Sequence, residues 1–158
     1  MNNDIYYQYN PWWEDTFIPN KYIERSSILE RMTKIANDNV ITILTGLRRV
    51  GKTTLMKLFI KKLINEGIKP KTIFYISLDD FLLNKKSIIE IISDFRKLQK
   101  LHLDEKVFLF LDEVTYKEDF HQQLKNIFDN QKAKIFVSAS SSSILKDKKA
   151  FLTGREIV

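Results

Sequence analysis

The sequence predicts an α/β domain of three layers, in which helices cover both faces of a mostly parallel β-sheet. Three observations lead to this fold class. Strand-like and helix-like segments alternate from residue 40 onward. The segment Val107–Leu111 is apolar at every position, as a strand covered on both faces must be. A glycine-containing turn at residues 46–53 joins a strand-like segment to an amphipathic helical one, which is the setting of a phosphate-binding loop.

The turn matches the pattern G-x-x-x-x-G-K-[ST] at every position from Gly46 to Thr53. The segment before it, Val40–Thr45, is rich in β-branched residues and short enough for a buried strand. The segment after it, Lys52–Glu66, has its apolar residues at helical spacing, and Gly67 stands where a helix C-terminal glycine belongs. The candidate nucleotide-binding residues are Gly46, Leu47, Arg48, Arg49, Val50, Gly51, Lys52, Thr53 and Thr54.

The residue types in this turn suit a triphosphate. Its two glycines let the backbone turn tightly and bring successive N–H groups onto phosphate oxygens. The first turn of the helix adds a partial positive charge of about half an elementary charge. We expect Lys52 to reach the β- and γ-phosphates and the Thr53 hydroxyl to ligate Mg²⁺. The alternative is a chance match in a glycine turn, which the flanking strand and helix disfavour.

A second motif follows the apolar strand, where Asp112 and Glu113 form an acidic pair of the Walker B type. Asp112 can hold the Mg²⁺ shell beside Thr53, and Glu113 can orient the attacking water or accept its proton. The alternative for such a pair is an ordinary turn. A second acid directly after the metal-binding Asp indicates ATP hydrolysis, whereas a GTPase would show a D-x-x-G motif at this point and a small-molecule kinase rarely needs a carboxylate that positions water.

The segment 134–139 predicts a further strand that runs into a run of serines. In ATPases with a catalytic glutamate, this strand lies between the phosphate-loop strand and the Walker B strand. Ser138 and Ser140 are the candidates to touch the γ-phosphate and the attacking water. The run of serines is equally typical of a helix N-terminus, and both interpretations stay open.

The remaining segments complete the α/β alternation. Capping boxes of a serine and a glutamate, Ser27 with Glu30 and Ser87 with Glu90, predict the starts of two helices. Residues 72–78 predict a strand that ends at Asp79 and Asp80, which we interpret as turn formers, and residues 119–131 predict another helix.

Residues 1–22 are rich in aromatic side chains, and Pro11 and Pro19 argue against regular structure there. Because so many exposed rings would be costly, we expect an irregular arm that packs on the core of residues 23–158. Coverage of a nucleotide base by this arm is the alternative.

Composition narrows the function classes. The net charge is +6, but the lysines are scattered along helix faces and turns, so a nucleic-acid partner is possible and not favoured. The absence of cysteine excludes disulfides and thiolate metal sites and fits the cytoplasm. His102 and His121 stand far apart and lack a ligand-like pattern. Neither a signal-peptide pattern nor an apolar run of membrane-spanning length is seen.

With these motifs in view, the chain resembles the prokaryotic AAA-type ATPase domain of the archaeal-ATPase-like family. The resemblance is carried, in the family's order, by residues 10–13 (NPWW), 46–54 (GLRRVGKTT), 111–113 (LDE), 137–141 (VSASS) and 152–155 (LTGR). It implies a P-loop NTPase fold with strand order 5-1-4-3-2, and binding of ATP and Mg²⁺. It also implies a sensor role for Ser140 and a phosphate-sensing or arginine-finger role for Arg155. Ala139 departs from the family, which usually has Gly there.

Such proteins continue past the Gly-Arg segment into a strand and a lid-like helical region, often followed by a further domain. We therefore expect a C-terminally truncated ATPase core with a shortened fifth strand, and a homo-oligomer or a missing C-terminal domain as partner. The expected activity is Mg²⁺-dependent ATP hydrolysis, with Glu113, Lys52, Arg155 and Ser140 as catalytic residues and Thr53 and Asp112 as metal ligands. The alternatives are an ATP-binding module with little turnover and a nucleic-acid-associated ATPase.

Overall fold

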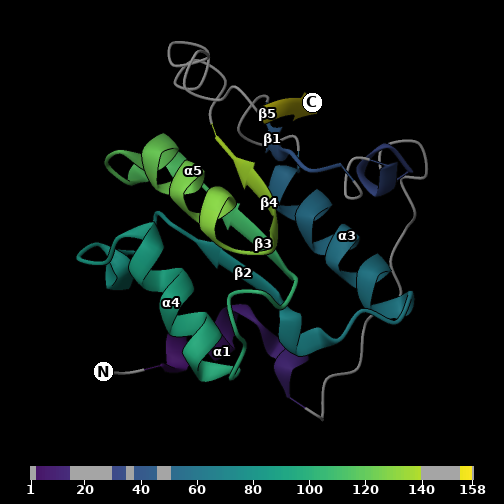
Figure 1. Cartoon of the computed structure of the whole chain (residues 1–158), viewed down its shortest axis with the longest axis horizontal. Helices are drawn as coiled ribbons and strands as arrows, with labels where there is room; N and C mark the ends of the chain where they lie inside the picture. The colour runs from purple at the N-terminus through teal and green to yellow at the C-terminus, as the bar shows by residue number, and fades with distance from the viewer. Residues whose placement is uncertain (1–2, 15–29, 35–37, 46–50, 140–153, 158) are drawn as a thin grey trace.

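The computed structural model describes residues 3–14, 30–34, 38–45, 51–139 and 154–157. Its centre is a five-stranded parallel sheet with the strand order β2-β3-β4-β1-β5 (Figure 1). The strands are β1 (Ile41–Leu44), β2 (Ile73–Ser77), β3 (Val107–Asp112), β4 (Ala133–Ser138) and β5 (Gly154–Ile157). This order confirms the predicted 5-1-4-3-2, including the place of the fourth strand between the phosphate-loop strand and the Walker B strand.

Helices cover both faces of the sheet and confirm the three-layer prediction (Figure 1). Helix α3 (Lys52–Asn65) packs on one face, and α4 (Ile88–Leu98), α5 (Phe120–Asn130) and α1 (Asp4–Tyr9) pack on the other. Alternation along each strand divides the core. In β3, Val107, Leu109 and Leu111 join the cluster under α4 and α5, whereas Phe108 and Phe110 join the cluster under α3. None of the helices in the described ranges is long and apolar enough to cross a membrane.

Aromatic packing fixes α3 against the middle of the sheet. The rings of Phe110 and Phe136, on neighbouring strands, stack with centroids 4.7 Å apart. Phe59 of α3 packs on the same pair, 5.3 Å from the Phe136 ring. Rings of this size contribute a large share of the apolar area that a core buries, so these contacts hold α3 on this face of the sheet.

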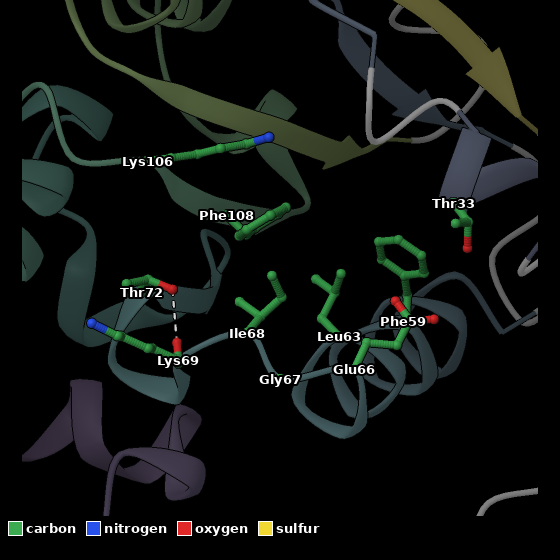
Figure 2. Close-up of a pocket in the computed structure, with 10 residues that line it drawn as sticks. All are labelled: Thr33, Phe59, Leu63, Glu66, Gly67, Ile68, Lys69, Thr72, Lys106 and Phe108. Atoms are coloured by element: carbon green, nitrogen blue, oxygen red, sulfur yellow. Dashed lines mark hydrogen bonds between the residues drawn. The ribbon is translucent and has the colours of Figure 1, made fainter.

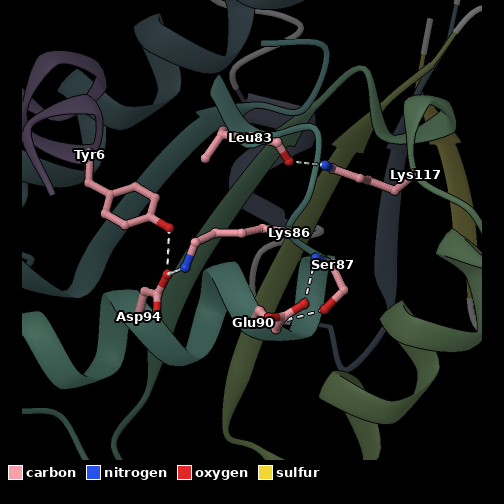
Figure 3. A network of polar contacts seen from close by, with 7 residues as sticks. All are labelled: Tyr6, Leu83, Lys86, Ser87, Glu90, Asp94 and Lys117. Atoms are coloured by element: carbon pink, nitrogen blue, oxygen red, sulfur yellow. Dashed lines mark hydrogen bonds and ion pairs between the residues drawn. The ribbon is translucent and has the colours of Figure 1, made fainter. Parts of the chain in front are cut away.

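Helix boundaries follow the local signals in the sequence. The capping box at the start of α4 is present in full, with Ser87 Oγ accepting from the Glu90 N–H at 3.1 Å and the Glu90 carboxylate accepting from the Ser87 N–H at 3.0 Å (Figure 3). These bonds from Ser87 lower the pKa of Glu90. Gly67, at a φ of +96°, ends α3 as predicted. The predicted box at Ser27 lies outside the described residues, and residues 30–34 are helical.

The prediction of an irregular N-terminal arm is wrong for residues 4–13. They form α1 and the short 3-10 helix η1 (Pro11–Trp13), and Ile5 and Tyr6 are buried against the sheet. Pro11 is compatible with this structure because it occupies the first position of η1, where its missing N–H has no helical partner to lose. The Trp13 ring stacks on Phe74 and Phe95 at 5.9 and 5.6 Å.

Side chains of this N-terminal segment form hydrogen bonds with backbone groups at the outer edge of β2, the terminal strand of the sheet. The Tyr75 N–H donates to Asn10 Oδ1 at 2.7 Å, and Asn10 Nδ2 donates to the Tyr75 carbonyl at 2.8 Å. The indole N–H groups of Trp12 and Trp13 both donate to the Ile73 carbonyl, at 3.0 and 2.8 Å. Amide and indole groups thus take the place of a further strand, which meets the requirement that buried backbone polar groups be paired.

We expect Asn10→Ala to lower the free energy of unfolding by about 2–4 kcal/mol, because it leaves both backbone groups of Tyr75 without partners in a buried place. Chemical denaturation measures the change. Asn130→Ala is the matched control, since that amide donates to the Asn126 carbonyl on an exposed helix face, and we expect a loss below about 0.5 kcal/mol. Equal losses for the two variants would contradict the role given to Asn10.

Candidate functional site

The candidate site lies where the first turn of α3 meets the carboxyl ends of β3 and β4. In an open parallel sheet every strand ends at this same edge, where ligands bind. Gly51 precedes α3 with a φ of +81°, a left-handed conformation that favours glycine. Its carbonyl accepts the first helical bond, from Leu55 N–H at 2.7 Å. The first two residues of the helix, Lys52 and Thr53, are therefore presented at the ligand edge.

The centre of the site is the Asp112 carboxylate, which is 2% exposed. Thr53 Oγ1 donates to Asp112 Oδ2 at 2.6 Å, and the Tyr75 hydroxyl donates to the same oxygen at 2.5 Å. The Ser138 hydroxyl donates to the other oxygen, Oδ1. A buried charge is tolerated only when it is paired or well hydrogen-bonded, and three hydroxyl donors from three elements meet that requirement here.

Lys52 contacts the residue that directly follows β4. Its ammonium group donates to the Ala139 carbonyl at 2.8 Å. The Ala139 N–H donates in turn to the Leu44 carbonyl at 3.2 Å, which joins the ends of β4 and β1. The structure thus brings Lys52, Thr53 and Asp112 to one edge, as the two sequence motifs predicted.

Glu113 follows Asp112 and has a φ of +56°, in the left-handed region that a side chain disfavours by roughly 1–2 kcal/mol. This conformation turns the chain out of β3 and into the 3-10 helix η4 (Val114–Tyr116). The Glu113 N–H donates to Ser138 Oγ at 2.9 Å. Ser138 therefore bridges the two members of the acidic pair, because its hydroxyl accepts from Glu113 and donates to Asp112.

Two tyrosines of the site region were not found by sequence reasoning. Tyr75 lies on β2 and reaches Asp112, and the Tyr9 ring packs on it with centroids 5.9 Å apart. The Tyr9 hydroxyl donates to Asp80 Oδ2 at 2.6 Å. Burial, followed by the charge of Asp112 and the bond to it, raises the pKa of Tyr75. Nothing local marks such a residue, because a tyrosine in a strand is typical of an ordinary core position.

The loops after β2 and β3 are also joined. Asp80 caps the 3-10 helix η3 (Phe81–Leu83), accepting from the Leu82 N–H at 2.9 Å, in agreement with its interpretation as a turn former. The buried Lys117 ammonium donates to the Leu83 carbonyl, and burial lowers the pKa of Lys117 (Figure 3). This contact ties the segment after η4 to η3 and stiffens the edge beside the site.

The donor set suits Mg²⁺. The Thr53 hydroxyl and the Asp112 carboxylate are hard oxygen ligands on groups 2.6 Å apart. Within the described ranges, no cluster of three or more His, Cys, Asp or Glu side chains could hold a metal by itself. Mg²⁺ is typically bound through one or two protein oxygens together with substrate phosphates and water, so this pair fits a metal that arrives with a nucleotide.

Several predicted site residues are not placed by the structure. The loop residues Gly46–Val50 and the serine Ser140 lie outside the described residues. Arg155 lies within β5, where its backbone is in register with Thr42, two positions before the last pair of Leu44 and Ile157. Thr54 occupies the first turn of α3 and is exposed.

A cavity of about 500 Å³ lies away from this edge (Figure 2). Its lining comes from the end of α3, with Leu63 and Gly67, and from the start of β3, with Lys106 and Phe108. These are the amino ends of the strands, opposite the edge that carries Asp112. We assign no part of the nucleotide site to this cavity.

Comparison with known proteins agrees with the geometry. A family model described as AAA domain matches residues 38–158. The chain belongs to the AAA domain family. This match supports an AAA-like P-loop fold with a nucleotide-binding, ATPase-like role for the domain.

Relatives of this AAA domain are longer. It is 33% identical over 129 residues to the uncharacterised protein MJ1637 of Methanocaldococcus jannaschii, covering 80% of this chain and 27% of that protein. It is 22% identical over 139 residues to an uncharacterised protein of Haemophilus influenzae, covering 85% of this chain and 34% of that protein. The chain thus spans about a third or less of the curated relatives it matches.

Two solved structures are similar to the AAA domain at a TM-score of 0.50. One is the crystal structure of a DNA replication initiation factor, 20% identical, covering 87% of this chain and 48% of that one. The other is C. elegans PCH-2, 17% identical, covering 95% of this chain and 46% of that one. At these identities the likeness shows the fold alone.

The tyrosines predict how stability depends on pH. Burial and a bond to a carboxylate raise the pKa of Tyr6, Tyr9 and Tyr75 above the ordinary 10.0. A raised pKa in the folded state stabilises the protein fully below pH 10.0, and this contribution is lost as the pH rises further. We expect the free energy of unfolding to fall above that pH, and these tyrosines to ionise together with unfolding.

Near-ultraviolet absorbance of tyrosinate and denaturation curves at a series of pH values measure both effects. The variant Tyr6→Phe removes one of these hydroxyls, the one that donates to Asp94 at 2.7 Å. The tyrosinate absorbance that appears only with unfolding should then decrease by the contribution of one tyrosine. A folded protein in which every tyrosine ionised near pH 10.0 would contradict the assignment.

Proposed function

We propose that this AAA domain binds ATP together with Mg²⁺ and hydrolyses its terminal phosphoanhydride bond. The observation that carries the proposal is the 2.6 Å hydrogen bond between Thr53 and Asp112. It joins the residue directly after the phosphate-loop lysine to the buried carboxylate at the end of β3. Two motifs far apart in the sequence therefore supply one pair of oxygen ligands, as a Mg²⁺-dependent nucleotide site requires.

Each residue has a role that follows from its place. Backbone N–H groups of residues 46–54 cradle the phosphates, and Lys52 supplies an ammonium group for the β- and γ-phosphate oxygens. Thr53 and Asp112 hold Mg²⁺, which neutralises charge on those oxygens. Glu113 orients the attacking water and accepts its proton. Its backbone is fixed for this task by the bond to Ser138.

The two serines at the end of β4 take different parts in this proposal. Ser138 is engaged with Asp112 and Glu113, so we assign it to holding the acidic pair in place. Ser140, two residues further on, and Arg155 are proposed to sense the γ-phosphate and to offset charge in the transition state, as the family resemblance implies.

We propose that residues 1–22 are an arm and residues 23–158 are the ATPase core. We also propose a further domain or a second copy of the chain as partner.

An ATP-binding module with little turnover is the alternative that the same contacts support. The relatives extend well beyond the region that this chain matches, so elements needed for turnover or for client recognition can lie in their remaining length. The experiment on Glu113 separates the two functions, because a binding module loses nothing measurable when the water-orienting carboxylate is removed.

We expect Lys52→Ala to weaken ATP binding roughly a hundredfold, because the variant removes a charge-assisted contact to the phosphates. Isothermal titration calorimetry measures the affinity. Lys61→Ala, a lysine nine residues further along the same helix, is the control and should bind as wild type. Unchanged affinity in Lys52→Ala would refute the loop assignment.

We expect Glu113→Gln to retain ATP binding and to slow hydrolysis by about 10²–10⁴-fold, since it removes a general base. Single-turnover hydrolysis of radiolabelled ATP measures the rate constant. Glu118→Gln, an exposed acid beyond η4, is the matched control and should hydrolyse at the wild-type rate. If ATP is hydrolysed equally slowly by wild type and by Glu113→Gln, this chain is a binding module and the hydrolase proposal is wrong.

A further inference from the structure

Tyr75 joins the N-terminal segment to the carboxylate proposed to bind metal. Its backbone N–H and carbonyl are both held by the Asn10 side chain, at 2.7 and 2.8 Å. Its hydroxyl donates to Asp112 Oδ2 at 2.5 Å. Asn10 lies far before the phosphate loop in the sequence. Through one residue of the edge strand, it is nevertheless connected with the centre of the site.

Two of the three hydrogen bonds to the Asp112 carboxylate come from groups that are not proposed metal ligands. Thr53, the third donor, is itself a proposed ligand, because its oxygen keeps lone pairs for Mg²⁺ while its O–H donates to Oδ2. Of the other two, Tyr75 donates to Oδ2 and Ser138 donates to Oδ1. With one donor on each oxygen, the plane of the carboxylate stays fixed. The Asp112 carbonyl is also held, because it accepts from the Leu78 N–H at 2.9 Å.

The Tyr75 ring is in turn held from the side of α3 and from the N-terminal segment. The Lys57 ammonium lies 5.2 Å from its centroid, and the Tyr9 ring packs at 5.9 Å. The Tyr9 hydroxyl donates to Asp80, just beyond the end of β2, at 2.6 Å. With a relative exposure of 2% and both ends fixed, Tyr75 has little freedom to withdraw from Asp112.

We propose that Tyr75 is a positioning residue for Mg²⁺ binding, and that Asn10 sets the position of Tyr75. The proposal rests on the proposed function, because it concerns the same metal site. Groups that hydrogen-bond a metal ligand without touching the metal hold that ligand in its binding orientation, and their loss weakens metal binding about 10–100-fold. Tyr75 stands in this relation to Asp112.

The competing explanation is that Tyr75 is an ordinary core tyrosine whose hydroxyl happens to find an acceptor. Tyr6 provides the comparison. It is equally buried, at 1% exposure, it packs on the same sheet, and its hydroxyl also donates to a carboxylate, that of Asp94 at 2.7 Å (Figure 3). Asp94 lies on α4 and also pairs with Lys86, far from the proposed metal ligands. Tyr6→Phe therefore removes the same chemical group without touching the site.

The test is a calorimetric titration of Mg²⁺ into the protein saturated with ADP, together with a titration of ADP in the presence of a chelator. We expect Tyr75→Phe to weaken Mg²⁺ binding about 10–100-fold and to leave metal-free ADP affinity within about twofold of wild type. Tyr6→Phe should match wild type in both titrations. Near-ultraviolet circular dichroism checks that each variant is folded.

Asn10→Ala is the second variant, and it keeps the proposal testable should Tyr75→Phe fail to fold. It leaves the Tyr75 hydroxyl in place and removes the backbone clamp, together with the bond from Asn10 Nδ2 to the Tyr6 carbonyl. We therefore expect Mg²⁺ affinity to fall in the same direction by a smaller factor, with metal-free ADP affinity unchanged.

The outcomes separate the two proposals. If wild type binds Mg²⁺ with ADP and the affinity is the same in Tyr75→Phe, or in Asn10→Ala where that variant alone is folded, the positioning role is wrong and the proposed function stands. If metal-free ADP binding falls as much as Mg²⁺ binding, the effect is a general loss of structure and the positioning role is again wrong. If wild-type protein binds neither ADP nor Mg²⁺ with ADP, the proposed function itself fails.

Discussion

The structure depends on a buried carboxylate that must be satisfied. Asp112 ends a strand whose other residues are apolar, so no water-filled surroundings offset its charge. Among the described residues, the groups that hydrogen-bond this carboxylate are hydroxyls, and each comes from a different element: Thr53 from α3, Tyr75 from β2 and Ser138 from β4. A neutral set of donors leaves the negative charge available for a metal ion. The same bonds fix α3, β2 and β4 relative to one another at the ligand edge.

A second constraint acts at the outer edge of the sheet. At the outer edge of a terminal strand, the N–H and C=O groups of every second residue have no partner strand. Exposed edges of this kind can pair with strands of other chains. Here Asn10, Trp12 and Trp13 take up the groups of β2 at Ile73 and Tyr75. The proline before the two tryptophans starts a 3-10 helix that brings both indoles to one carbonyl. The NPWW segment therefore has a structural role, pairing the edge of β2, that does not depend on nucleotide binding.

The features that the sequence predicted are those with local signals. The alternation of strand-like and helical segments, the Ser87 capping box and Gly67 are each encoded within a few residues, and the structure has all of them. The strand order followed from the two motifs and the resemblance. The sequence could not predict that residues 4–9 and 11–13 are helical, because the stabilising contacts are to β2, some sixty residues away. Nor could it predict that Tyr75 reaches Asp112 or that Glu113 takes a left-handed conformation, since both follow from the packing of neighbouring strands.

Both constraints involve Tyr75. The strand edge is satisfied through the backbone of Tyr75, and the carboxylate through its side chain, so a shift of the N-terminal segment moves the donor on Asp112. Thr53 is itself a proposed metal ligand, so among the described residues Tyr75 is the one side-chain donor to Oδ2 that would only orient the carboxylate. Under the proposed function, the hold of Asn10 on the backbone of β2 therefore bears on how Asp112 is presented to the metal.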